Sequence, residues 1–167
     1  MKAYRYNPKN RSHRRFNDCR KEKNPNAVKY YALSLEYAQA YKYIFTDSGD
    51  IDYECTLEVA DIENLNIFNM AENYKSLATY QNYIAAAIAT MLKDYTYYLK
   101  KAKKATERKI WEKRIAEIAN EEKSLESNLI QNEFQALSDF DWQNELIKEL
   151  RSLGFNSYKT KNEIAIF

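Results

Sequence analysis

The chain has short strand-like patterns near its two ends and long helical patterns in its middle. Residues 51–59 alternate strictly, with apolar or aromatic side chains at every second position and acidic or hydroxyl side chains between them. This period of two predicts a half-buried strand. Short runs rich in aromatic and branched residues occur at 2–6, 28–33, 65–68 and 164–167, and we expect these to form strands as well.

The middle of the chain has helical periodicity. Residues 50–153 contain no Gly or Pro, and apolar side chains recur at helical spacing over 74–99 and again over 111–129. We expect two long helices that form an antiparallel pair. The segment 100–109 is dense in charge and is predicted to lie at or near their junction.

Two shorter helices are predicted outside this pair. Ser34 is suited to cap a helix over 35–45, and Glu36 would favour the positive end of its dipole. An amphipathic helix is predicted over 141–153, closed by Gly154 in the left-handed conformation. The terminal strands are expected to pair in space, because a strand is not stable alone. The predicted fold class is therefore α+β.

The length of 167 residues favours one domain, placed over 1–167 with a helical insertion at about 71–138. No segment approaches the roughly 20 apolar residues that a membrane span requires, and the polar, basic N-terminus does not resemble a signal peptide. Cys19 and Cys55 are isolated in the sequence, which is typical of free thiols in a reducing compartment. We therefore expect a cytoplasmic protein without membrane contact.

Composition excludes several kinds of site. One histidine and two isolated cysteines cannot form a classical zinc site, so no metal is predicted. Only two glycines occur, which excludes both the P-loop and the G-x-G-x-x-G turn. The net charge is +2 and basic residues gather in the run 11–23, so direct nucleic-acid binding is not expected. That run is interpreted as a solvated loop, with attraction of nucleotide phosphates as the alternative.

Three separated segments offer groups for one ligand. A cation suits a phosphate, aromatic rings suit a flat cationic ring, and a carboxylate suits a ribose and positive charge developing on it. Each group also has an ordinary structural interpretation, as a surface ion pair, a helix cap, a core aromatic or a surface carboxylate. The segments hold Tyr4 and Arg5, then Tyr30, Tyr31 and Ser34 with Tyr37 and Tyr41 on the following helix, and finally Glu163.

The order of these segments resembles the ADP-ribosyltransferase superfamily. In that family the first strand carries Arg or His beside an aromatic residue, and a later strand carries an aromatic residue and Ser or Thr before a helix. A late strand carries the catalytic Glu. The similarity covers roughly the first 70 and the last 25 residues. It rests on Tyr4-Arg5, on YYALSLEYAQAY from Tyr30, on LNIFNM from Leu65, and on the ending LRSLGFNSYKTKNEIAIF.

The resemblance implies a split β-sheet that binds NAD, as a substrate, without a Rossmann motif. The implied activity is mono-ADP-ribosyl transfer to a protein target, and some compact members of the superfamily are phage anti-defence proteins, including anti-CRISPR proteins. Carried over by position, Glu163 is the catalytic acid, Arg5 the first-strand cation beside Tyr4, Ser34 the hydroxyl, and Tyr31, Tyr37 and Tyr41 the aromatic residues near nicotinamide.

Two departures from the family pattern affect the expected target. Many arginine-modifying members have Glu or Gln two residues before the catalytic Glu, where this chain has Lys161. Family members often have Gly-Phe-Asp-Gly where this chain has Gly154-Phe155-Asn156-Ser157. Two alternatives remain open: a non-enzymatic protein whose helical pair binds or inhibits a partner, and a toxin that hydrolyses NAD without a protein acceptor.

Overall fold

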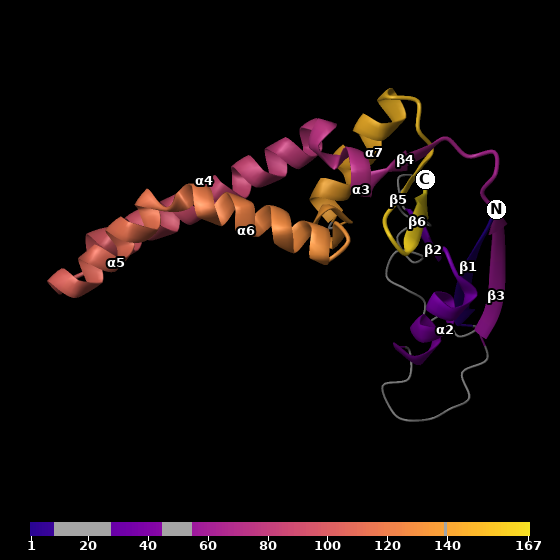
Figure 1. Cartoon of the computed structure of the whole chain (residues 1–167), viewed down its shortest axis with the longest axis horizontal. Helices are drawn as coiled ribbons and strands as arrows, with labels where there is room; N and C mark the ends of the chain where they lie inside the picture. The colour runs from indigo at the N-terminus through magenta and orange to yellow at the C-terminus, as the bar shows by residue number, and fades with distance from the viewer. Residues whose placement is uncertain (9–27, 45–54, 139) are drawn as a thin grey trace. The chain divides into compact units, whose positions relative to one another are not determined.

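A computed structural model of the chain describes residues 1–8, 28–44, 55–138 and 140–167 (Figure 1). It combines one mixed sheet with several helices, which confirms the predicted α+β class. The predicted basic run at 11–23 lies outside the described residues, as do Cys19 and the first four residues of the predicted strand 51–59.

The chain divides into two compact units. The sheet unit contains residues 1–73 and 147–167, and the helical unit contains residues 74–146. The sequence predicted its helical insertion at about 71–138, within a single domain.

The sheet unit is built on six strands in the order β3-β1-β2-β6-β5-β4. Neighbouring strands are antiparallel, except that β4 and β5 are parallel. The predicted pairing of the two chain ends is confirmed, because β2 lies beside β6. The strands are β1 (Lys2–Pro8), β2 (Lys29–Ala32), β3 (Cys55–Asp61), β4 (Ile67–Asn69), β5 (Ser157–Lys159) and β6 (Glu163–Ile166).

On the edge strand β3, two apolar side chains face solvent. Leu57 is 40% exposed and Val59 is 46% exposed, whereas Glu58 between them is half-buried. The period of two is therefore real, but the Leu57 and Val59 side chains face solvent rather than the core. One core cluster of this unit lies on the other face of the sheet, where Ala3, Tyr31, Ile62 and Ile164 pack together.

Helix α2 (Leu35–Ile44) follows β2 directly and contacts both β1 and β2. Ser34 caps it as predicted, since its Oγ accepts a hydrogen bond from the backbone N–H of Tyr37 at 3.1 Å. Helix α7 (Phe140–Ser152) is also close to its predicted span. Gly154 follows it with φ of +86°, the left-handed conformation expected of a closing glycine.

The helical unit is an antiparallel hairpin, as predicted. Helix α4 (Ala78–Lys101) is followed by α5 (Ala105–Ala116) and α6 (Ile118–Gln131), and both of these contact α4 (Figure 1). The predicted second long helix is divided at Glu117, whose φ and ψ of −97° and 16° depart from helical values. The remaining short helices are α3 (Met70–Asn73), η2 (Tyr74–Ser76) and η3 (Gln135–Ser138).

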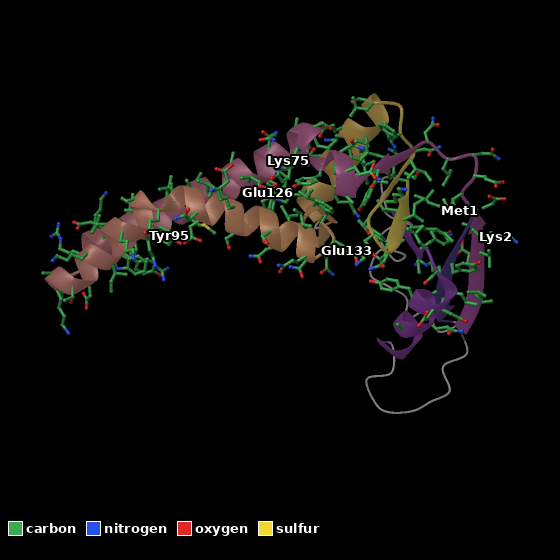
Figure 2. The ribbon with its side chains drawn as sticks, in the orientation of Figure 1. Met1, Lys2, Lys75, Tyr95, Glu126 and Glu133 are labelled. Atoms are coloured by element: carbon green, nitrogen blue, oxygen red, sulfur yellow. The ribbon has the colours of Figure 1, made fainter. Side chains whose placement is uncertain are left out.

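Three polar side chains join the start of the helical unit to α6. The Tyr74 hydroxyl donates to Glu126 Oε1 at 2.6 Å, and Lys75 Nζ lies 2.6 Å from the same oxygen (Figure 2). The hydrogen bond from Lys75, followed by that from Tyr74, lowers the pKa of Glu126. Burial, followed by the hydrogen bond to Glu126, raises the pKa of Tyr74. The folded chain therefore favours ionised Glu126 and neutral Tyr74.

Replacing Glu126 with Gln should destabilise the helical unit by about 1 kcal/mol at neutral pH, because the charged acceptor is lost. A lowered folded pKa means that the carboxylate stabilises the fold above its ordinary pKa of 4.5 and loses this effect as the pH falls through the folded value. The raised pKa of Tyr74 acts oppositely, since its contribution is present below pH 10 and is lost at higher pH.

Denaturant unfolding followed by circular dichroism between about pH 3 and pH 7 measures the difference in free energy of unfolding between wild type and Glu126→Gln. We expect the difference in free energy of unfolding between Glu126→Gln and wild type to shrink as the pH falls below 4.5 toward the lowered pKa of Glu126. A difference in free energy of unfolding that stays constant across this pH range would contradict the stabilising role of the Glu126 charge.

Candidate active site in the sheet unit

One row of residues crosses three central strands of the sheet. Tyr4 of β1 is in register with Ala32 of β2, and Ala32 is in register with Glu163 of β6. Paired residues in antiparallel strands project to the same face of the sheet. The Tyr4, Ala32 and Glu163 side chains therefore share one face, called the site face below, and the small Ala32 leaves space between the two larger residues.

A hollow lies at this row, with one side formed by α2. Its enclosed space is about 10 Å³, roughly the room needed by a single water molecule. In this conformation it accommodates a small part of a ligand, and a ring the size of nicotinamide requires the bordering side chains to move. The hollow is lined by Tyr4, Arg5, Tyr6, Tyr30, Ala32, Ala38 and Glu163.

The backbone around Glu163 is fixed from two directions. Its N–H donates to Thr160 Oγ1 at 3.3 Å, and its carbonyl accepts from the Thr160 N–H at 2.9 Å. The Leu33 N–H donates to the carbonyl of Asn162 at 2.8 Å, which ties this turn to the end of β2. The tight β5–β6 turn and the pairing with β2 together determine where the half-buried Glu163 side chain leaves the sheet.

Arg5 borders the same hollow but is only 4% exposed. Its Nη1 donates to the carbonyl of Tyr30 at 3.4 Å, and it is in register with Glu58 of β3. Because successive strand residues alternate, Arg5 projects from the face opposite to its neighbour Tyr4. The structure thus brings Arg5 close to Glu163, with its guanidinium buried rather than presented to an incoming phosphate.

Ser34 lies at the N-terminus of α2 and is exposed. Its hydroxyl oxygen accepts the Tyr37 N–H, so the capping interpretation is observed directly. It is not among the residues that border the hollow, although it comes only two residues after Ala32. A contact between Ser34 and a ligand stays a prediction.

Among the described side chains, Tyr4 is the one tyrosine predicted from the resemblance that borders the hollow. Tyr31 is buried on the core face, and its hydroxyl donates to Glu58 Oε1 at 2.6 Å. Tyr37 is half-buried in the first turn of α2, and the side chain of Tyr41 lies outside the described residues. The aromatic residues that border the hollow are Tyr4, which was predicted, together with Tyr6 and Tyr30.

Glu58 is the polar residue that the sequence gave least reason to single out. It accepts from the buried Tyr31 hydroxyl and lies 2.9 Å from Lys29 Nζ, opposite Arg5. In the sequence it is one of four alternating polar residues, which indicates a solvent-facing side chain. Only the pairing of β3 with β1 reveals that this position meets a buried arginine.

No family model, curated protein or solved structure matches this chain. The interpretation of the site therefore rests on its own residues. Within the described ranges, no three His, Cys, Asp or Glu side chains are grouped to hold a metal ion. Among the helices in those ranges, none has both the length and the apolar character needed to cross a membrane.

The Tyr31–Glu58 contact predicts a measurable coupling. Glu58→Ala should destabilise the chain by about 1–3 kcal/mol, because it removes a charged acceptor from a buried phenol. Tyr31→Phe should cost about 1 kcal/mol. In the double variant the two losses should fall short of their sum by at least about 0.5 kcal/mol, as measured by urea unfolding. Strict additivity would show that the hydrogen bond does not contribute to stability.

Proposed function

We propose that the site face binds NAD and that the chain is a mono-ADP-ribosyltransferase with a protein target. One observation carries the proposal: Arg5 and Glu163, from opposite ends of the chain, border the same hollow together with three tyrosines. A cation, aromatic rings and a carboxylate around one space match the parts of a dinucleotide. The anti-defence setting implied by the resemblance makes a component of a host defence system, such as a CRISPR complex, the proposed target.

The proposed chemistry separates charge at the ribose. The bond between ribose and nicotinamide breaks, and its electron pair leaves with nicotinamide. The Glu163 carboxylate stabilises the positive charge that develops on the sugar. A nucleophile of the target then supplies an electron pair to the ribosyl carbon, and its proton passes to solvent.

The bordering tyrosines and Arg5 have separate proposed roles. The rings of Tyr4, Tyr6 and Tyr30 provide flat apolar surfaces against which a cationic ring can stack. Arg5 lies behind this surface, where it holds the carbonyl of Tyr30 and adds positive charge near the phosphates. We therefore propose Arg5 as a positioning residue rather than as a direct phosphate ligand.

The charge of Lys161 affects which side chain of the target can accept ADP-ribose. It is exposed in the turn that leads into β6, two residues before Glu163. A positive side chain here repels an incoming arginine. The proposed acceptor is accordingly a side chain other than arginine.

Glu163→Gln tests the proposal because it keeps the shape of the side chain and removes its charge. Transfer of biotin-labelled ADP-ribose from NAD to proteins of a candidate host lysate should fall by about 10²–10³. Glu72→Gln is the matched control, since Glu72 is an exposed carboxylate on α3 of the same unit. This control should transfer at the wild-type rate, with circular dichroism reporting that both variants are folded.

Equal transfer by Glu163→Gln and wild type would contradict the proposed mechanism. Release of nicotinamide by the protein alone, without a labelled acceptor, would assign the chain to NAD hydrolysis instead. The small enclosed space favours a second candidate, a non-enzymatic binding protein. That candidate predicts no heat of NAD binding in calorimetry and full biological activity of Glu163→Gln.

A further inference from the structure

Positive charge is concentrated around the junction of α4 and α5. Residues 93–114 contain nine Lys and Arg against three Asp and Glu, a net charge of +6, whereas the whole chain has a net charge of +2. The sequence-based expectation against nucleic-acid binding rested on the net charge of +2 and on the basic run 11–23. The hairpin instead brings a second basic group together within the helical unit.

Helix stability explains only part of this charge. Lys100 and Lys101 lie in the last turn of α4, where cations favour the negative end of the helix dipole. Lys103 and Lys104 immediately precede α5, so they lie at the positive end of its dipole, where cations are unfavourable. Helix α5 also has no buried residue. Neither packing nor dipole interactions accounts for these lysines.

Exposed aromatic rings accompany the lysines. Tyr97 is 56% exposed and Tyr98 is 50% exposed. Lys101 Nζ lies 5.7 Å from the centre of the Tyr97 ring, so a cation and a ring are presented together. The Tyr98 ring stacks on Trp111 of α5, with centroids 5.0 Å apart and an interplanar angle of 20°.

Tyr95 of α4 belongs to the same aromatic cluster and contacts both α5 and α6. Tyr95 lies 5.8 Å from Trp111 between ring centroids, and its hydroxyl donates to Glu121 of α6 at 3.3 Å (Figure 2). Arg114 lies over the Trp111 ring at 5.3 Å. The exposed rings are thus carried by an ordered junction rather than by a free loop.

We propose that this α4–α5 surface, formed by Tyr97, Tyr98, Lys100, Lys101, Lys103 and Lys104, binds single-stranded nucleic acid. A single strand offers phosphates to the lysines and unpaired bases to the exposed rings. An acidic protein segment satisfies the cations but leaves the rings without a partner, and a duplex keeps its bases stacked inside. The inference does not depend on the proposed transferase activity, because its residues lie in the other unit.

Fluorescence anisotropy of a labelled single strand of about 16 nucleotides, titrated with the full chain, tests the proposal. Neutralising Lys100, Lys101, Lys103 and Lys104 to Gln should weaken binding at least about tenfold at low salt. It should also flatten the dependence of log K on log salt concentration by about 3, as expected for four lost phosphate contacts on a single strand.

The matched control neutralises four other lysines, Lys2, Lys123, Lys148 and Lys161, which lowers the net charge of the chain by the same amount. It should retain affinity within about twofold, because phosphate contacts rather than net charge supply the binding. If the control weakens binding as much as the four changes at the junction, or if wild type does not bind at low salt, the proposal is overturned.

Tyr97 tests the contribution of stacking, since its ring is exposed and its ring neighbours Tyr98 and Lys101 lie on the same helix. Tyr97→Ala should weaken binding about tenfold, and Tyr97→Trp should preserve it, because stacking needs a flat ring rather than a hydroxyl. Wild-type affinity in Tyr97→Ala would overturn the proposal. So would displacement of the labelled strand by polyglutamate as effectively as by an unlabelled strand, because this would indicate an acidic protein as the ligand.

Discussion

The antiparallel pairing of β2 with β6 is the constraint on which the site in the sheet unit depends. It sets Ala32 opposite Glu163, and β1 then sets Tyr4 in the same row. A slip of one residue would turn Glu163 toward the core face and bring Ile164 to the site face. The buried Ile164 opposes such a slip, because it packs with Tyr31 and Ala3 in the core. Burial of one face therefore fixes the position of the carboxylate on the other.

Much of the fold follows from local patterns in the sequence. A period of two predicted β3, and runs rich in aromatic and branched residues predicted the other described strands except β5, which has only three residues. A helical period predicted the helical hairpin with its charged junction. Ser34 and Gly154 mark helix ends by their own chemistry, and both predictions are confirmed. The division of the second long helix at Glu117 was not predicted, since no Gly or Pro marks it.

The face on which each candidate group lies could not be predicted, because it depends on strand register. Tyr4 and Arg5 are adjacent in the sequence, yet only Tyr4 shares the row of Glu163. Tyr31 follows the aromatic pattern of the resemblance, but the register directs it to Glu58 in the core. The exposure of the aromatic rings at the α4–α5 junction was likewise not predicted, because the helical pattern of this segment indicates packing. For Tyr4 and Tyr31 the determining partners are distant in the sequence.

The central claim is that NAD binds to the site face of the sheet unit. Hydrogen–deuterium exchange with mass spectrometry, with and without saturating NAD, tests it directly because it locates the change on the chain. We predict slower exchange in peptides covering residues 4–6, 30–38 and 160–165, with no change over α5 and α6. Unchanged exchange throughout, or protection confined to the helical unit, would contradict the claim.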